Sequence, residues 1–144
     1  MAEIHSQLKQ DCILLGRLPL SHLLLMNDAN YPWFILVPDR DEVTEIYQLS
    51  LDDQQQLLAE SSLLGQVLMK HFEGDKLNIG ALGNMVPQLH LHHIVRYRND
   101  LAWPAPVWGK GVAEKYTQET LNDLVMRLKL ILQAEVTFVE TITI

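Results

Sequence analysis

The sequence predicts an α+β fold with a mostly antiparallel, five-stranded sheet, one long helix and one or two shorter helices. Three observations lead to this prediction. Short apolar runs bounded by turn residues recur along the chain, hairpin-like turns join several of these runs, and two longer segments repeat apolar residues at three- and four-residue steps. Glycine and proline occur singly or in short turns, without a linker, so we expect one domain over residues 1–144.

Three apolar runs in the first part of the chain are predicted strands. Residues 12–15 and 22–26 flank Gly16-Arg17-Leu18-Pro19, which is typical of a turn between paired strands. Residues 33–37 form the third run, and Pro38 with the acidic stretch after it ends that strand.

The hydrophobic period changes after residue 50. Ser50 precedes Asp52 and Asp53, a pattern that marks the start of a helix. Apolar residues then recur at helical spacing as far as Phe72. This segment, residues 50–72, is the predicted long helix.

The remaining elements are assigned in the same way. Residues 76–82 and 86–97 are predicted strands, and the prolines and glycines of residues 100–111 indicate a loop. Residues 118–133 have the spacing of a second amphipathic helix. The alternating tail, residues 136–144, is expected to add an edge strand, either within one chain or across a dimer.

Charge and composition exclude several classes of protein. The 144 residues carry a formal net charge of −7, which argues against a general nucleic-acid or membrane-surface binder. No apolar run reaches the length of a spanning helix and the start lacks a secretory signal, so we expect a cytoplasmic protein. The single cysteine, Cys12, excludes an internal disulfide and a cysteine-based zinc knuckle. Residues 76–112 carry a local charge of +3 and three of the six histidines, which would suit a small anion.

The three clustered histidines lie in the predicted strand 86–97. Alternate side chains share one face of a strand, so Gln88, His90 and His92 point one way, with Arg96 further along, and His93 points the other way. A ladder of polar groups about 7 Å apart is poorly tolerated on a buried sheet face. We therefore expect the first set to line a cleft.

Two imidazoles at this spacing are compatible with three interpretations. They can bind a metal ion, although no third ligand is evident nearby. One can act as a nucleophile at a phosphorus or acyl centre while its neighbours stabilise the transition state. They can also lie on a solvent-facing edge and only form hydrogen bonds. The spacing does not decide between these three.

The run GNMVPQLHLHHIVR, residues 83–96, resembles the signature of the histidine-triad (HIT) family, in which three histidines alternate with hydrophobic residues along a strand. The predicted strand 33–37 and helix 50–72 also occur in the family's order. The resemblance covers about residues 12–112, whereas residues 115–144 match loosely. It implies a HIT-like fold and a bacterial-type member in which Gln88 stands at the first histidine position.

The resemblance also implies roles for individual residues. His90 corresponds to the nucleophile that attacks the α-phosphorus of a nucleotide and forms a nucleotidyl-histidine intermediate. His92 corresponds to the histidine that contacts the phosphate and handles the leaving group. Gln88 completes the catalytic set; it can form hydrogen bonds but cannot carry a positive charge. The substrate-binding residues implied by the resemblance are Asn27, Leu25, Asn78, Asn84 and Met85.

The resemblance implies a nucleotide hydrolase or nucleotidyl transferase. Such an enzyme cleaves a phosphoanhydride or phosphoramidate bond at the α-phosphorus, for example in a dinucleoside polyphosphate. Because Gln88 departs from the triad, a nucleotide-binding or sensing module with little turnover is the alternative. We expect no metal and no other cofactor, a homodimer, and neither nucleic acid nor a membrane as a partner.

Overall fold

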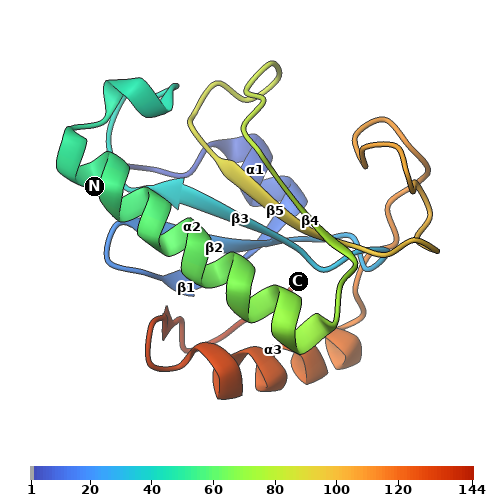
Figure 1. Ribbon diagram of the computed structural model, residues 1–144. Coiled ribbons are helices and arrows are strands. Elements are labelled where there is room, and N and C mark those ends of the chain that lie inside the picture. Colours follow the sequence, from blue (N-terminus) through green and yellow to red (C-terminus); the bar gives the residue numbers. More distant parts are fainter. Residues whose placement is uncertain (1) are drawn as a thin grey trace.

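The computed structural model describes residues 2–144 and contains one six-stranded sheet in the order β4-β5-β3-β2-β1-β6 (Figure 1). All neighbouring strands are antiparallel. The strands are β1 Cys12–Arg17, β2 Ser21–Met26, β3 Trp33–Pro38, β4 Lys76–Gly80, β5 Leu91–Arg96 and β6 Thr137–Phe138. The predicted α+β class with an antiparallel sheet is confirmed, and the sheet has one strand more than the five predicted.

The helices begin where capping side chains are available. In α2, Leu51–Phe72, the hydroxyl of Ser50 accepts a hydrogen bond from the Asp53 N–H at 3.1 Å, as the Ser50 signal predicts. In α3, Gln118–Leu132, Thr117 forms the corresponding cap. Two short elements were not predicted: α1, Ser6–Asp11, and a 3₁₀ turn, η1, Ile46–Gln48. They are too short for a hydrophobic period to reveal them.

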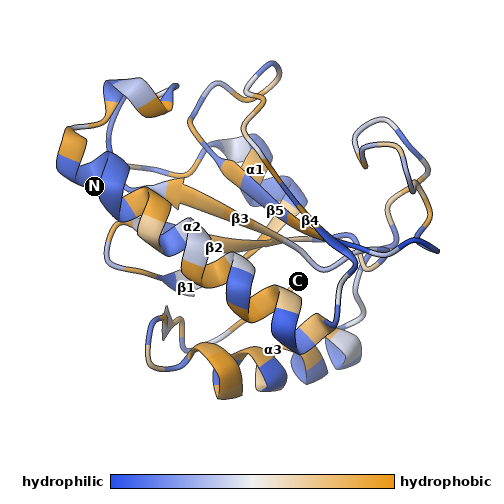
Figure 2. Cartoon of the chain, in the orientation of Figure 1, coloured by the Kyte–Doolittle hydropathy of each residue, from blue (hydrophilic) through white to orange (hydrophobic). Residues whose placement is uncertain are grey.

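The sheet has an apolar core on each face. Helices α2 and α3 pack on one face, where Leu64 and Leu128 meet strand residues such as Phe34. The other face is covered by α1 and by loops, with Leu8 and Val107 packing on Ile35. Figure 2 shows the apolar strands behind α2, whose surface alternates between apolar and polar residues.

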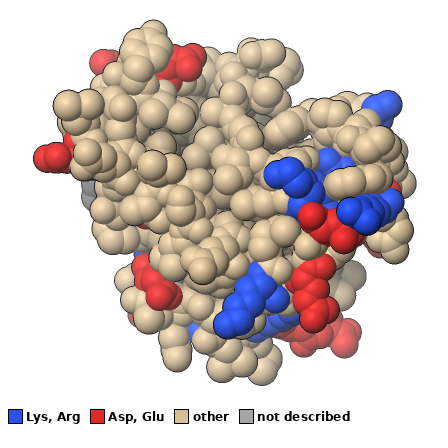
Figure 3. All heavy atoms as spheres, viewed as in Figure 1, with Lys and Arg blue, Asp and Glu red and all other residues tan. Residues whose placement is uncertain are grey.

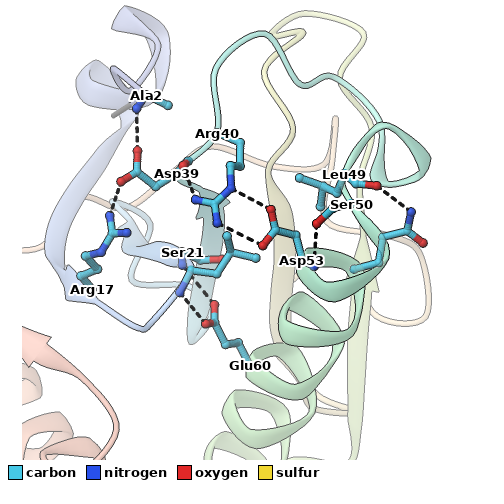
Figure 4. A network of polar contacts seen from close by, with 11 residues as sticks. Ala2, Arg17, Ser21, Asp39, Arg40, Leu49, Ser50, Asp53 and Glu60 are labelled. Carbon is cyan, nitrogen blue, oxygen red and sulfur yellow. Dashed lines mark hydrogen bonds and ion pairs between the residues drawn. The ribbon is translucent and has the colours of Figure 1, made fainter.

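A partly buried polar network joins the end of β3 to the start of α2 (Figure 4). Asp39 accepts hydrogen bonds from the Ala2 N–H and from Arg17, and the next residue, Arg40, forms an ion pair with Asp53 of α2. Further along α2, the buried Glu60 accepts the N–H groups of Leu20 and Ser21 at 2.8 and 3.1 Å. These contacts hold α2 across the sheet.

The histidine-bearing strand is shorter than predicted. Strand β5 begins at Leu91 rather than at residue 86, because β4 already ends at Gly80, opposite His92, and offers no partner further on. The Leu89 N–H donates to Val43 O in the loop after β3 instead. Gln88 and His90 therefore precede the strand, and the predicted continuous strand 86–97 is wrong over its first five residues.

Only two residues of the chain tail, Thr137 and Phe138, add an edge strand within the same chain, so the strand predicted over residues 136–144 is wrong for most of its length. Gly16 and Arg17 of β1 pair with Phe138 and Thr137 of β6. A β-carbon on Gly16 would lie 2.3 Å from Thr137 O, so this close approach requires glycine. No helix among residues 2–144 is both long and apolar enough to cross a membrane.

Candidate active site

A pocket of about 340 Å³ lies on the sheet face covered by α1, away from α2 and α3. Its size falls within the range of small-molecule sites. Its walls come from α1, the start of β3, the loop before β5 and the loop after it. The lining residues are Leu8, Asp11, Met26, Trp33, Leu82, Gly83, Asn84, Met85, Val86, His90, His92 and Trp108.

His90 is held by the backbone of Gln88. Its Nδ1 lies 2.7 Å from the Gln88 carbonyl oxygen. A carbonyl oxygen can only accept, so Nδ1 carries the proton and donates it in this hydrogen bond. In the neutral ring the lone pair then lies on Nε2, which is the atom a nucleophile must offer.

His92 is held in the opposite tautomer. The indole N–H of Trp33 donates to His92 Nδ1 at 2.9 Å, so the proton of the neutral ring lies on Nε2. Burial, together with the nearby His90 and His93, lowers the pKa of His92 to about 3. His92 is therefore neutral at pH 7 and offers an N–H donor. Its ring centre lies 4.9 Å from that of His90.

Gln88 contributes its backbone rather than its side chain. The side-chain amide donates to Glu3 O at 3.0 Å and accepts from the His5 N–H at 2.8 Å, outside the pocket. This corrects the expectation that the amide joins His90 and His92 on one face. The reason is that Gln88 lies before β5, so the alternation of a strand does not apply to it.

Two of the five expected substrate-binding residues reach the pocket. Asn84 and Met85 line it, and the side chain of Met85 is exposed. Leu25 is instead fully buried in the core beneath α2 and α3, because alternation along β2 turns Met26 toward the pocket. Asn27 accepts the Tyr116 N–H at 2.9 Å, and Asn78 accepts from Arg96 at 2.8 Å; neither lines the pocket.

The local positive charge does not reach this pocket. Arg96 is 1% exposed, and its guanidinium binds Asp100 at 2.8 and 3.0 Å. No lysine or arginine occurs among the lining residues that the structure describes. The sequence-based expectation that the basic residues around the histidines line the site is therefore corrected: the polar side chains of the lining are two imidazoles, the Asn84 amide, the Trp indoles and the Asp11 carboxylate.

The third clustered histidine has a different environment. His93 lies on the other face of β5, as alternation predicts, and donates from Nδ1 to Leu91 O at 3.0 Å while Ser61 of α2 donates to its Nε2 at 2.7 Å. Burial lowers its pKa to about 4, against the opposing effect of the Leu91 carbonyl. Among residues 2–144, no group of three or more histidine, cysteine or acidic side chains could hold a metal ion.

The sequence reasoning did not identify several pocket residues. The contact of Trp33 with the pocket was predictable in principle. Ile35 pairs with His92 across the sheet, and Trp33 lies two residues before Ile35 on the same face of β3. Trp108 stands in a loop, where no period reveals its direction; its ring lies 5.2 Å from His92. Leu8 and Asp11 belong to α1, which no pattern in the sequence indicates.

Comparisons with known proteins agree with this architecture. The model of the HIT domain family matches residues 7–99. A histidine triad protein from Marinobacter aquaeolei VT8 is 50% identical, with a TM-score of 0.91 over 94% of this chain and 98% of that chain. Histidine triad proteins from Bradyrhizobium japonicum and Sinorhizobium meliloti 1021 are 44% and 41% identical, each with a TM-score of 0.87 over 90% of this chain and 96% of theirs. A search of curated proteins found no match.

Proposed function

The chain belongs to the HIT domain family, and from this membership and the two imidazoles of the pocket we propose that it cleaves a phosphoanhydride or phosphoramidate bond at the α-phosphorus of a nucleotide. The observation that carries the proposal is the hydrogen bond from His90 Nδ1 to the Gln88 carbonyl. That bond leaves the lone pair of the neutral ring on Nε2. His92, beside it, supplies an N–H donor.

In the first step, His90 Nε2 attacks the α-phosphorus. A P–N bond forms, the bond from phosphorus to the leaving oxygen or nitrogen breaks, and its electron pair stays with the leaving group. A leaving nitrogen also takes up a proton from solvent and departs as an amine. The Nε2–H of His92 stabilises the negative charge on the phosphoryl oxygens and the leaving group. Asn84, at the pocket wall, is placed to add a further donor.

In the second step, water attacks the phosphorus of the nucleotidyl-histidine intermediate. The P–N bond breaks, its electron pair returns to His90 Nε2, a proton of the attacking water passes to solvent, and a nucleoside monophosphate leaves. The proton remains on His90 Nδ1 and is donated in the hydrogen bond to the Gln88 carbonyl through both steps. Trp33 and Trp108 form an apolar wall that limits the access of water.

A second copy of the chain is the proposed partner. Strand β4 is an edge of the sheet, and a hollow of about 600 Å³ beside it is lined by residues of α2 and by Ile79 of β4. The apolar residues at this surface include Leu51, Leu58 and Ile79, which are 76%, 67% and 49% exposed. In Figure 3, basic and acidic side chains lie together at the right and below the centre, and most of the middle of this side carries no charged side chain. Pairing of β4 with β4 of a second copy would cover both the unpaired strand edge and the exposed apolar residues beside it.

A turnover assay tests the proposed activity. Dinucleoside polyphosphates and nucleoside phosphoramidates are incubated with the wild-type protein and with His90→Gly, with and without a chelator. We expect release of a nucleoside monophosphate by the wild type, unchanged by chelation, and a loss of at least about 1,000-fold in His90→Gly. Tight binding without turnover would instead favour a nucleotide-binding module. The described pocket lining contains no lysine or arginine side chain to stabilise a transition state, which is compatible with that alternative. Loss of activity on chelation would favour a metal hydrolase.

A further inference from the structure

The side chain of Gln88 is engaged with the N-terminal segment, residues 2–11. Its Nε2 donates to Glu3 O at 3.0 Å, and its Oε1 accepts from the His5 N–H at 2.8 Å. Both partners are main-chain atoms, separated from Gln88 by 85 and 83 positions in the sequence. One amide group thus fixes two points of a segment that belongs to no strand.

This segment leads directly into a wall of the pocket. His5 caps α1, since its Nδ1 accepts the Gln7 N–H at 3.0 Å. Three residues later, Leu8 is 4% exposed and packs in the core cluster that contains Trp33. Leu8 and Asp11 both line the pocket that holds His90 and His92. The position of α1 therefore determines part of the shape of the site.

Gln88 is connected to the site in a second way, through its main chain. Its carbonyl oxygen orients His90, as described above. The side chain and the carbonyl of this residue thus act on two different parts of the pocket, the α1 wall and the nucleophile. The carbonyl is present whatever the side chain is, so substitutions at position 88 act on the wall selectively.

We propose that Gln88 is a positioning residue whose side-chain amide anchors the N-terminal wall of the nucleotide pocket and so sets the affinity for the nucleotide. The identity of the ligand rests on the proposed function. Glutamine suits this role because one planar group donates to one main-chain site and accepts from another. A carboxylate at this position could accept from His5 but could not donate to Glu3 O.

The test compares Gln88→Ala and Gln88→Glu with a matched control, Gln10→Ala, which truncates an exposed glutamine of α1. Hydrogen exchange of residues 3–11, calorimetric binding of adenosine monophosphate, and kcat and KM are measured for each variant. For Gln88→Ala we expect exchange of residues 3–11 to rise about 10-fold, and Kd and KM to rise about 3- to 10-fold. In the same variant KM should change by a larger factor than kcat, because the Gln88 carbonyl that orients His90 remains. Gln88→Glu should behave similarly, and Gln10→Ala should match the wild type.

Two results would overturn this inference while leaving the proposed function intact. One is unchanged exchange and affinity in Gln88→Ala, which would show that the wall does not depend on this amide. The other is a large fall in kcat with unchanged KM and exchange, which would place the amide at the reacting atoms. A wild type that binds adenosine monophosphate but turns over no nucleotide would contradict the hydrolase proposal only. Hydrogen exchange of residues 3–11 and the affinity for adenosine monophosphate would still test the role of Gln88. A wild type that binds no nucleotide would overturn both.

Discussion

At the scale of single residues, the pocket holds two neighbouring imidazoles in complementary tautomers. The Gln88 carbonyl accepts from Nδ1 of His90, and the Trp33 indole donates to Nδ1 of His92. One neutral ring therefore has its free lone pair on Nε2, and the other has its proton there. This division of roles needs no metal ion and no lysine or arginine in the pocket lining.

The buried histidines also make stability depend on pH. The pKa values of His92 and His93 in the folded protein are about 3 and about 4, against an ordinary value of 6.5. The unfolded chain therefore binds more protons between about pH 4 and 6.5, and the free energy of unfolding falls as the pH decreases through this range. Each histidine contributes a loss of about 2–3 kcal/mol between pH 7 and 4.5.

Chemical denaturation of the wild type and of His93→Gln at pH 7 and 4.5 measures this effect. Glutamine can hydrogen-bond with Ser61 and Leu91 but does not titrate, so we expect the pH-dependent loss to shrink by about 2–3 kcal/mol in the variant. Equal losses in the two proteins would show that His93 does not titrate in this range.

The residues of the site were predictable to different degrees. The alternation of polar and apolar residues predicted that His92 and His93 lie on opposite faces, and this is confirmed. The partner that sets the tautomer of His90 was not predictable, because the spacing of residues does not say which carbonyl a ring nitrogen reaches. The contacts of Gln88 were not predictable either, because Glu3 and His5 lie more than 80 positions away.

At the scale of elements, the loop after β5 delivers Trp108 to the pocket. Asp100 accepts from Arg96 and from the N–H groups of Tyr97 and Trp103, and Arg96 donates to Ala105 O. Burial raises the pKa of Asp100, but these hydrogen bonds outweigh it and hold the pKa below its usual value. The buried ion pair thus folds the loop back onto the sheet.

Neutralising Asp100 tests the importance of this pair. Asp100→Asn leaves the buried Arg96 guanidinium without its counter-charge, so we expect the free energy of unfolding to fall by about 3 kcal/mol at pH 7. KM should also rise, because the loop that carries Trp108 loosens. Denaturant unfolding and steady-state kinetics measure the two effects, and Asn99→Ala, an exposed change in the same loop, is the control. An Asp100→Asn protein as stable as the control would contradict the role given to the pair.

Helices and strands were predictable from the sequence wherever the hydrophobic period extended over enough residues. The capped helix at Ser50 and the early strand runs match the structure closely. One exception is residues 86–90, whose alternating pattern suits a strand but which pair with neither β3 nor β4. Pairing is a tertiary property, so an apolar alternation alone does not reveal where a strand begins.

At the scale of the whole molecule, the apolar surface between α2 and β4 argues for a dimer. Because β4 is a sheet edge and Ile79 projects from it, a charge at this position would be buried without a partner in the dimer. We therefore expect the wild type to sediment as a dimer and Ile79→Asp to sediment as a monomer.

A matched variant separates this effect from a general effect of surface charge. Leu130 of α3 is 76% exposed and does not line the α2–β4 hollow, so Leu130→Asp should remain dimeric. Sedimentation velocity at micromolar concentration measures all three proteins. A monomeric wild type, or an Ile79→Asp protein that remains a dimer, would contradict this arrangement.

We propose that His90 Nε2 becomes covalently bonded to the α-phosphorus during turnover. Rapid mixing with adenosine phosphoramidate, followed by intact-mass measurement at neutral pH, tests it most directly. We predict a transient mass increase of one adenosine monophosphoryl group, located on His90 and absent from a folded His90→Gly protein. Steady turnover with no adduct, or an adduct on another residue, would contradict the account.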